Sequence, residues 1–180
     1  MVATKLVTIE DVERMPDDEF RYTLLDGVLY RMPLPQRKHA RIVSRVDRVV
    51  GVYVDDNALG ELLSESGYAL KRDPDTLLGP DLSFVRAGRL LPEHEDRYPD
   101  LAPDLAIEVR SPSEYGPSMA EKVRAYLDAG TRMVWFFDPK RRTVTVHRLG
   151  AEPVVLTETD HLDGGDVLPG FRVPVARFFA

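Results

Sequence analysis

The sequence predicts an α/β (α+β) protein whose central mixed β-sheet is flanked by helices, with an N-terminal helix and hairpin before them. Residues 36–53 and 118–129 have the apolar spacing of amphipathic helices, and short apolar runs between and after them have strand length. The order helix, hairpin, helix, several strands, helix, two strands is typical of one mixed sheet with helices on its faces. At 180 residues and without an internal repeat, residues 1–180 are expected to form a single domain.

Composition excludes several classes of protein. Hydrophobic residues make up 43% of the chain and charged residues 30%, which is typical of a globular protein and not of a disordered one. The absence of cysteine excludes disulfides, thiolate metal sites and cysteine nucleophiles. No apolar run is long enough for a membrane helix, and the N-terminus lacks a signal-peptide core, so we expect a cytoplasmic protein without a membrane partner. The net charge of -6 disfavours strong nonspecific nucleic-acid binding by the chain as a whole.

The first elements have clear local signals. Thr8 is a good N-cap for a short helix that Pro16 must end. Residues 20–32 have the pattern of a β-hairpin around the turn dipeptide Asp26-Gly27.

The helix predicted over residues 36–53 has two distinct sides. Its core side carries Ile42, Val46, Val49, Val50 and Tyr53. Its other side carries Arg37, Arg41, Arg45 and Arg48, which is either a phosphate-facing stripe or an ordinary solvated helix surface. His39 lies in the first turn and is either a site residue or a surface histidine.

In the middle of the chain, the residue pattern predicts strands over residues 61–70 and 77–85, joined by a turn at residues 73–75. A polar connection over residues 86–102 follows, of a length that is often functional or mobile. The next strand, over residues 105–109, is apolar except for Glu108, which shares a face with Ala106 and Arg110.

The helix after this strand begins at Ser118, which forms a capping-box pattern with Glu121. The buried stripe of this helix carries Met119, Val123, Tyr126 and Leu127. Lys122 lies about 60° from Met119 around the helix axis, at the border of this stripe. Its stem can therefore cross the core while its ammonium group points back at the sheet. Gly130 is a natural residue to end the helix.

After this helix, the residue pattern predicts strands over residues 132–137 and 143–148 and a short edge strand over residues 154–156. The remainder is expected to be irregular and to end in an apolar tail over residues 171–180. This tail is one reason to expect a homodimer.

Asp81, Glu108 and Lys122 form the candidate site for chemistry. Two acids on neighbouring strands can hold Mg²⁺ or Mn²⁺, and a nearby lysine can orient a water or neutralise charge on phosphate. Each residue also has a structural interpretation. Asp81 follows a proline as turn residues do, Glu108 has Arg110 as an available partner, and most lysines are surface residues.

Other catalytic patterns are absent from the sequence. It has no glycine-rich phosphate loop and no His-Glu-x-x-His helix, and Ser66-Gly67 lacks the flanking pattern of a nucleophile elbow. The histidines do not have zinc-ligand spacing; they are His39, His94, His147 and His161.

Four segments resemble the Uma family, a group of restriction-endonuclease-like nucleases formerly classed as a domain of unknown function. They are residues 80–85, 103–113, 121–130 and 134–139, with a further likeness at Asp26-Gly27 and His39. The resemblance covers roughly residues 8–150.

The resemblance implies the PD-(D/E)xK nuclease fold and a divalent-metal site. Asp81 matches the first acid of the motif and Glu108 the second. Arg110 stands where many members of the wider superfamily have lysine, and in this family the lysine is the one matched by Lys122. Family habit also favours a homodimer.

Two positions depart from the family pattern. Thr23 and Val28 stand where related sequences often have glutamate. If the first of these glutamates assists metal binding, Thr23 lacks the charge to replace it.

The leading hypothesis is therefore a Mg²⁺- or Mn²⁺-dependent endonuclease that hydrolyses DNA. Asp81 and Glu108 would bind the metal, Lys122 would assist catalysis, and substrate contacts would come from His39, Arg37, Arg41 and Arg110. The triplet at residues 140–142 is a further candidate for backbone contacts. The alternative is a catalytically impaired module that keeps the nuclease fold and binds nucleic acid or protein without cleavage.

Overall fold

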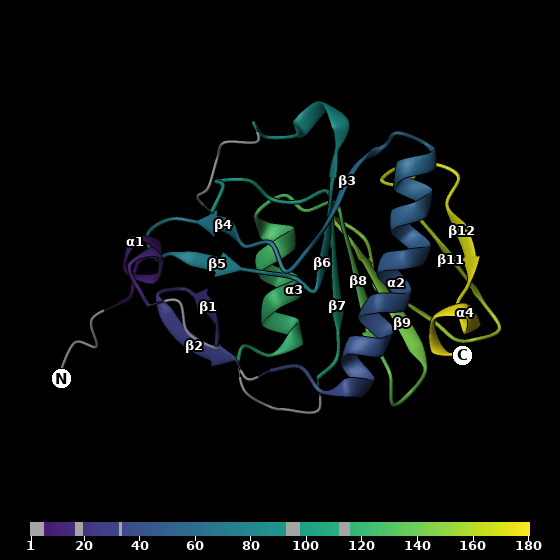
Figure 1. Cartoon of the computed structure of the whole chain (residues 1–180), viewed down its shortest axis with the longest axis horizontal. Coiled ribbons are helices and arrows are strands. Elements are labelled where there is room, and N and C mark those ends of the chain that lie inside the picture. Colours follow the sequence, from purple (N-terminus) through teal and green to yellow (C-terminus); the bar gives the residue numbers. More distant parts are fainter. Residues whose placement is uncertain (1–5, 17–19, 33, 93–97, 112–115) are drawn as a thin grey trace.

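The computed structural model describes residues 6–16, 20–32, 34–92, 98–111 and 116–180, and a six-stranded mixed sheet forms its centre (Figure 1). The strand order of this sheet is β10-β9-β8-β7-β6-β3. β7 and β8 are parallel and every other neighbouring pair is antiparallel. The bounds are β3 (Gly60–Ser64), β6 (Leu82–Arg86), β7 (Leu105–Val109), β8 (Met133–Asp138), β9 (Thr143–Arg148) and β10 (Val154–Leu156). The prediction of a central mixed sheet flanked by helices is confirmed.

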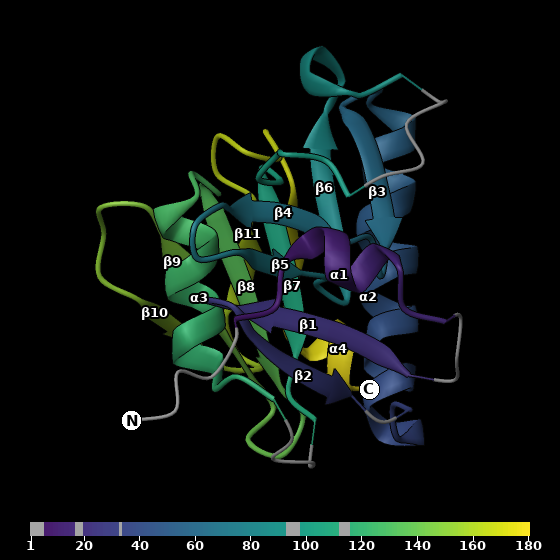
Figure 2. The same ribbon diagram turned by 90° about the vertical axis from the view of Figure 1, so that its left-hand side faces the viewer.

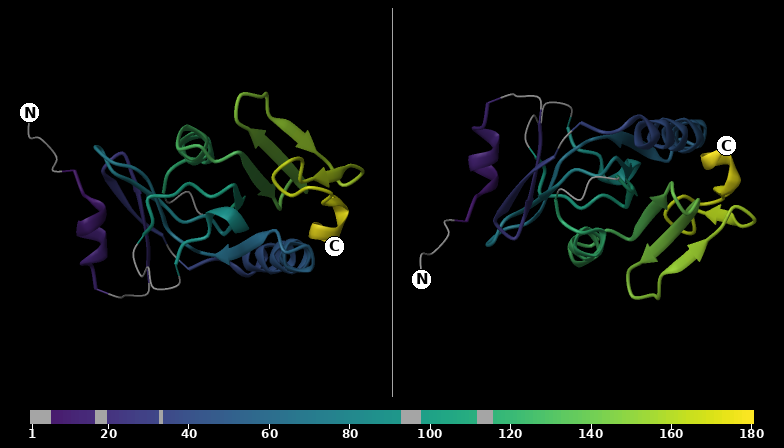
Figure 3. Two further views of the ribbon diagram at one scale, coloured as in Figure 1. Left: turned by 90° about the horizontal axis from the view of Figure 1, so that it is seen from above. Right: turned by 90° about the horizontal axis from the view of Figure 1, so that it is seen from below.

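Two long helices cover opposite faces of this sheet (Figures 1 and 3). α2 (Arg37–Asp56) packs its buried valines and Ile42 on one face, together with the C-terminal part of the chain. α3 (Met119–Asp128) links β7 to β8 and packs Val123 and Tyr126 on the other face. Ser118 caps α3 through a capping box, and Gly130 follows its end with φ of 98°, as the sequence predicts.

A second, antiparallel sheet lies on the α3 side of the central sheet (Figure 2). Its order is β2-β1-β5-β4, with β1 (Arg21–Leu25), β2 (Val28–Met32), β4 (Tyr68–Lys71) and β5 (Thr76–Leu78). The predicted hairpin forms β1 and β2 around Asp26-Gly27. α1 (Ile9–Glu13), which Thr8 caps as predicted, packs on this sheet through Ile9 and Val12.

Two of the predicted strands are wrong in their extent. Each contains a break, so residues 61–70 form β3 and β4, while residues 77–85 form β5 and β6. The breaks fall near Gly67 and at Gly79-Pro80, where proline has no amide hydrogen for a strand ladder. Each segment thereby leaves one sheet and enters the other. Both crossings lie beside Asp81, because one ends at Pro80 and Glu65 in the other donates its amide to the Asp81 carbonyl.

The C-terminal part is more regular than predicted. It contains β11 (His161–Asp163), β12 (Arg172–Pro174) and α4 (Ala176–Phe179). Phe171 lies 5.6 Å from Trp135 between ring centroids, and Phe178 lies 5.3 Å from Phe137. The apolar tail is therefore part of this chain's own core, and it does not supply the exposed apolar face that suggested a homodimer.

The predicted polar connection contains a short 3-10 helix, η1 (Ala87–Arg89), and the stretch that includes His94 lies outside the described residues. None of the helices in the described part of the chain has both the length and the apolar character needed to cross a membrane.

Asp104 joins the ends of three central strands. It is fully buried, and its carboxylate accepts hydrogen bonds from the Arg86 side chain at 2.7 Å and the Arg86 amide at 3.1 Å, with Arg89 3.0 Å away. Its carbonyl accepts from the amide of Met133. Burial acts to raise the pKa of Asp104, but the bonds from Arg86 and the charges of Arg89 and Arg86 outweigh it and lower the pKa below its usual value.

Replacing Asp104 is expected to destabilise the fold. Asp104→Asn should cost about 3 kcal/mol at neutral pH, because two arginines lose a buried anion. A carboxyl group with a lowered folded-state pKa stabilises the fold above its unfolded pKa and loses that contribution as the pH falls through the folded value. The difference in the free energy of unfolding between the wild type and Asp104→Asn, measured in urea, should therefore shrink below about pH 4. Asp128→Asn, which breaks an exposed ion pair with Arg124, is the control and should cost less than about 0.5 kcal/mol. Equal losses in the two variants would contradict this role.

Candidate active site

The register between β6 and β7 brings the two predicted acids together. Leu82 pairs with Ile107 and Ser83 with Ala106 in this antiparallel ladder. Continuing the register by one residue places Asp81 opposite Glu108, on the face of the sheet that carries Ser83 and Ala106. That face is covered by α3 and by the second sheet. The prediction that these acids lie on neighbouring strands is confirmed.

Asp81 is held firmly by one oxygen. Its Oδ2 accepts a hydrogen bond of 2.7 Å from the amide of Val109 and contacts Nε2 of His39 at 3.1 Å. The residue is 8% exposed. Neither contact uses Oδ1, so this oxygen remains available as a ligand atom.

Glu108 is 3% exposed and is matched by two donors. Lys122 Nζ lies 3.1 Å from Oε1 and 2.9 Å from Oε2, and the Tyr126 hydroxyl donates to Oε1 at 3.0 Å. Burial raises the pKa of Glu108, Lys122 acts to lower it, and Asp81 raises it further. Glu108 therefore gives up its proton less readily than an exposed glutamate does.

Lys122 lies where its helical position predicts. Its side chain is only 14% exposed and reaches from α3 back to Glu108. The alternative in which Arg110 pairs with Glu108 is wrong. Arg110 instead contacts Asp138 at 2.9 Å, because the parallel pairing of β7 with β8 places these two residues side by side.

Tyr126 is a site residue that the sequence analysis missed. The helical pattern placed it in the apolar stripe, and it is indeed fully buried. Burial raises the pKa of its phenol well above the usual value, and Glu108 adds to the rise, so the hydroxyl stays protonated as a donor. Its place one turn after Lys122 was the available signal, because both residues then face Glu108.

His39 lies beside Asp81 rather than on the surface. It is 7% exposed, and its Nε2 faces a carboxylate that can only accept, so this nitrogen carries a proton. Its Nδ1 is buried and has no hydrogen-bond partner among the described residues.

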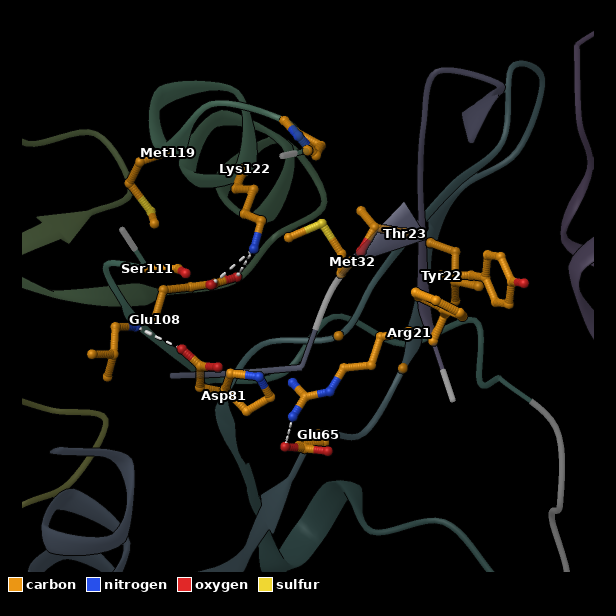
Figure 4. Close-up of a pocket in the computed structure, with 18 of the residues that line it drawn as sticks. Arg21, Tyr22, Thr23, Met32, Glu65, Asp81, Glu108, Ser111, Met119 and Lys122 are labelled. Carbon is orange, nitrogen blue, oxygen red and sulfur yellow. Dashed lines mark hydrogen bonds and ion pairs between the residues drawn. The ribbon is translucent and has the colours of Figure 1, made fainter. Parts of the chain in front are cut away.

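The acids open into a cavity of about 880 Å³ between the central sheet and the second sheet. Figure 4 shows Asp81, Glu108 and Lys122 on one side of it, and Arg21 and Thr23 of β1 on the other. Arg21 forms an ion pair with Glu65, which also lines the cavity.

Of the two departures from the family pattern, Thr23 borders this cavity and is buried, whereas Val28 is 49% exposed at the hairpin turn. Only Thr23 therefore bears on the chemistry of the site.

The predicted substrate contacts divide into two groups. His39 and Arg110 line the cavity. The described lining residues do not include Arg37 or Arg41. Each is two residues from His39 and so projects about 200° away from it around α2. Arg41 instead bonds the carbonyl of Ala180 at 3.3 Å, at the C-terminus.

The two acids suit a hard divalent cation. Among the described residues, no group of three or more His, Asp or Glu side chains is arranged to hold a metal ion. Mg²⁺ needs fewer protein ligands, since it binds through one or two carboxylates and keeps several waters. Oδ1 of Asp81 and Oε2 of Glu108 each retain a free lone pair, because the Val109 amide bonds Oδ2 of Asp81 and Lys122 uses only one lone pair of Oε2. The donor set therefore fits Mg²⁺ or Mn²⁺.

The buried ion pair predicts a pH-dependent loss of stability in Lys122→Met. Without the ammonium group, the pKa of Glu108 should rise further. A carboxyl group with a raised folded-state pKa stabilises the fold below its unfolded pKa, and this contribution is lost as the pH rises through the folded value. We expect the variant to be close to wild type at about pH 4 and about 3 kcal/mol less stable at about pH 8.

Urea unfolding in EDTA at both pH values measures this difference. Arg124→Met, on the exposed side of α3 where the side chain is 83% exposed, is the matched control and should show no such pH dependence. A Lys122→Met effect that is the same at both pH values would contradict the pairing with Glu108.

Comparison with known proteins supports the resemblance stated above. The profile of the Uma2 family, described as "Putative restriction endonuclease", matches residues 9–176. A crystal structure from Anabaena variabilis ATCC 29413, described as a "putative nuclease belonging to DUF820", has the same fold, with a TM-score of 0.82. It is 24% identical, and the match covers 96% of this chain and 97% of that chain. No curated protein matched the sequence. Because the profile spans almost the whole chain, the chain belongs to the Uma2 family.

Proposed function

We propose that the chain is an endonuclease that hydrolyses phosphodiester bonds in DNA with Mg²⁺ or Mn²⁺ as cofactor. The observation that carries this proposal is the cross-strand pair of Asp81 and Glu108, on the wall of a cavity and with Lys122 paired to Glu108. Membership of a family described as "Putative restriction endonuclease" supports the same reaction class.

Asp81 and Glu108 would hold the metal through Oδ1 and Oε2. A bound divalent ion would polarise the phosphate and lower the pKa of a bound water. Asp81 is kept in place for this task by the Val109 amide and by His39, and Glu108 by Tyr126. These contacts keep both carboxylates oriented before any ligand arrives.

Lys122 has two tasks in this proposal. Its ammonium balances Glu108 while the site is empty of substrate. It would also hydrogen-bond an attacking water or neutralise the charge that develops on phosphate oxygens. The large cavity leaves room for the phosphodiester beside these groups.

Cleavage of a labelled DNA substrate in Mg²⁺ or Mn²⁺ tests the proposal. Asp81→Asn, Glu108→Gln and Lys122→Ala should each lower the rate by at least about 100-fold, since each removes a ligand or a preorganised charge. EDTA should abolish cleavage by the wild type.

Glu61→Gln and Arg124→Ala are the controls, because they change an exposed acid of β3 and an exposed cation of α3 without touching the cavity. Both should cleave at the wild-type rate. Full activity in any of the three site variants would show that the residues are assigned wrongly.

One observation favours the alternative of a binding module without cleavage. Thr23 occupies the β1 side of the cavity where relatives often have glutamate, so the site has one charge fewer. Thr23→Glu separates the two functions. A gain of metal-dependent cleavage in this variant, from an inactive wild type that binds nucleic acid, would support the impaired module over the active enzyme.

A further inference from the structure

The depth of the candidate site limits the shape of its substrate. Asp81 and Glu108 are 8% and 3% exposed, and they open into a cavity of about 880 Å³. Pockets of about 300–1,000 Å³ hold drug-sized molecules, and a nucleotide is of that size. Duplex DNA is stiff over about 150 base pairs and carries its phosphates on a convex surface. An intact duplex therefore fits this concave site poorly.

The cavity wall offers a ring for an unpaired base. Tyr98 lines the cavity and is 36% exposed. It packs closely on Gly67, because a Cβ at that residue would lie 2.7 Å from Cδ1 and Cε1 of the ring. The absence of a side chain at Gly67 thus leaves room for the ring at this position. Bases stack on such rings only when they are unpaired and unstacked from their neighbours.

The charges inside the cavity do not attract a dense polyanion. Arg21 is paired with Glu65, and Lys122 with Glu108. Both of these cations are thus matched by an acid of the same cavity. Arg110, which also lines the cavity, is paired with Asp138 on the neighbouring strand. Duplex binding needs many uncompensated cations, because its affinity comes largely from neutralised phosphates.

Among the described residues, two cations without an ion-pair partner follow the carboxyl end of β8, next to the cavity-lining Arg110. Arg110 lines the rim and contacts Asp138 on the neighbouring strand. Oδ1 of Asp138 also accepts the amides of Lys140 and Arg141, which fixes the turn. The side chains of these two residues are exposed and form no ion pair within the described part of the chain.

Arg142, although next in sequence, has a structural role. It bonds Glu158 through two nitrogens at 2.5 Å and the carbonyl of Phe179 at 3.1 Å. The triplet at residues 140–142 therefore divides into two cations without an ion-pair partner among the described residues and one, Arg142, that holds the C-terminal segment.

We propose that the cavity accepts an unpaired strand of nucleic acid, with a base stacked on Tyr98 and the phosphates of the departing strand on Lys140 and Arg141. The inference rests on the proposed nuclease function and names its substrate class. A duplex would have to be locally opened before it could enter, which costs base-pairing and stacking energy.

Fluorescence anisotropy with labelled oligonucleotides in Ca²⁺, which takes oxygen ligands as Mg²⁺ does, measures the preference. The wild type should bind a single strand at least about tenfold more tightly than the blunt duplex of the same sequence. Tyr98→Ala should weaken single-strand binding about tenfold. Replacing both Lys140 and Arg141 by alanine should reduce the slope of log K against log salt by about 1.4, for two phosphates.

The control variant replaces Arg124 and Arg172, which are exposed and not among the described residues that line the cavity, by alanine and should leave affinity and salt slope unchanged. Equal or tighter binding of the duplex would overturn the inference, as would a lack of binding to either form. Metal-dependent cleavage of duplex as fast as of single strand would overturn the inference, while the nuclease proposal would stand. A wild type that neither cleaves nor binds either form would overturn both the inference and the nuclease proposal.

Discussion

The buried carboxylate of Glu108 is the constraint on which the site depends. An ionised acid at 3% exposure is costly unless cations and donors compensate it. Lys122 and Tyr126 supply that compensation, and both come from one face of α3, one turn apart. The match to this charge and the packing of Val123 and Tyr126 together orient α3 on the sheet, and α3 forms one wall of the cavity.

The two faces of the central sheet have different roles. The α2 face is packed with apolar side chains, including the aromatic residues of the C-terminal part, and gives the sheet its rigidity. The α3 face keeps a smaller apolar cluster and leaves room for charge. Because strand residues alternate between faces, Ile107 lies in the large core while its neighbour Glu108 faces the cavity. A rigid sheet therefore holds the acids at fixed positions.

The local signals in the sequence predicted most of the elements before residue 157 and the neighbouring positions of Asp81, Glu108 and Lys122, but not the breaks in two strands or the C-terminal elements. Helical spacing placed Lys122 at the border of a buried face, and period two placed Glu108 on the face opposite Ile107. Both follow from geometry within one element. What the sequence could not predict depends on pairing between distant segments. The partner of Arg110 is Asp138 because β7 and β8 are parallel, and His39 meets Asp81 because α2 begins beside β6.

Two further features were hidden by their residue types. The hydroxyl of Tyr126 does not alter an apolar pattern, so a residue that donates to Glu108 looked like ordinary core. The apolar tail looked like a surface for another chain, whereas Phe178 and Phe179 close the core under α2. The hydrophobic composition of a segment does not show whether it packs in the core of its own chain or against another chain.

Calorimetric titration of Mn²⁺ tests most directly the central claim that Asp81 and Glu108 form a divalent-metal site. The account predicts saturable binding to the wild type, loss of that binding in Glu108→Gln, and unchanged binding in the exposed control Glu61→Gln. Binding that is as tight in Glu108→Gln as in the wild type, or no binding to either protein, would contradict it.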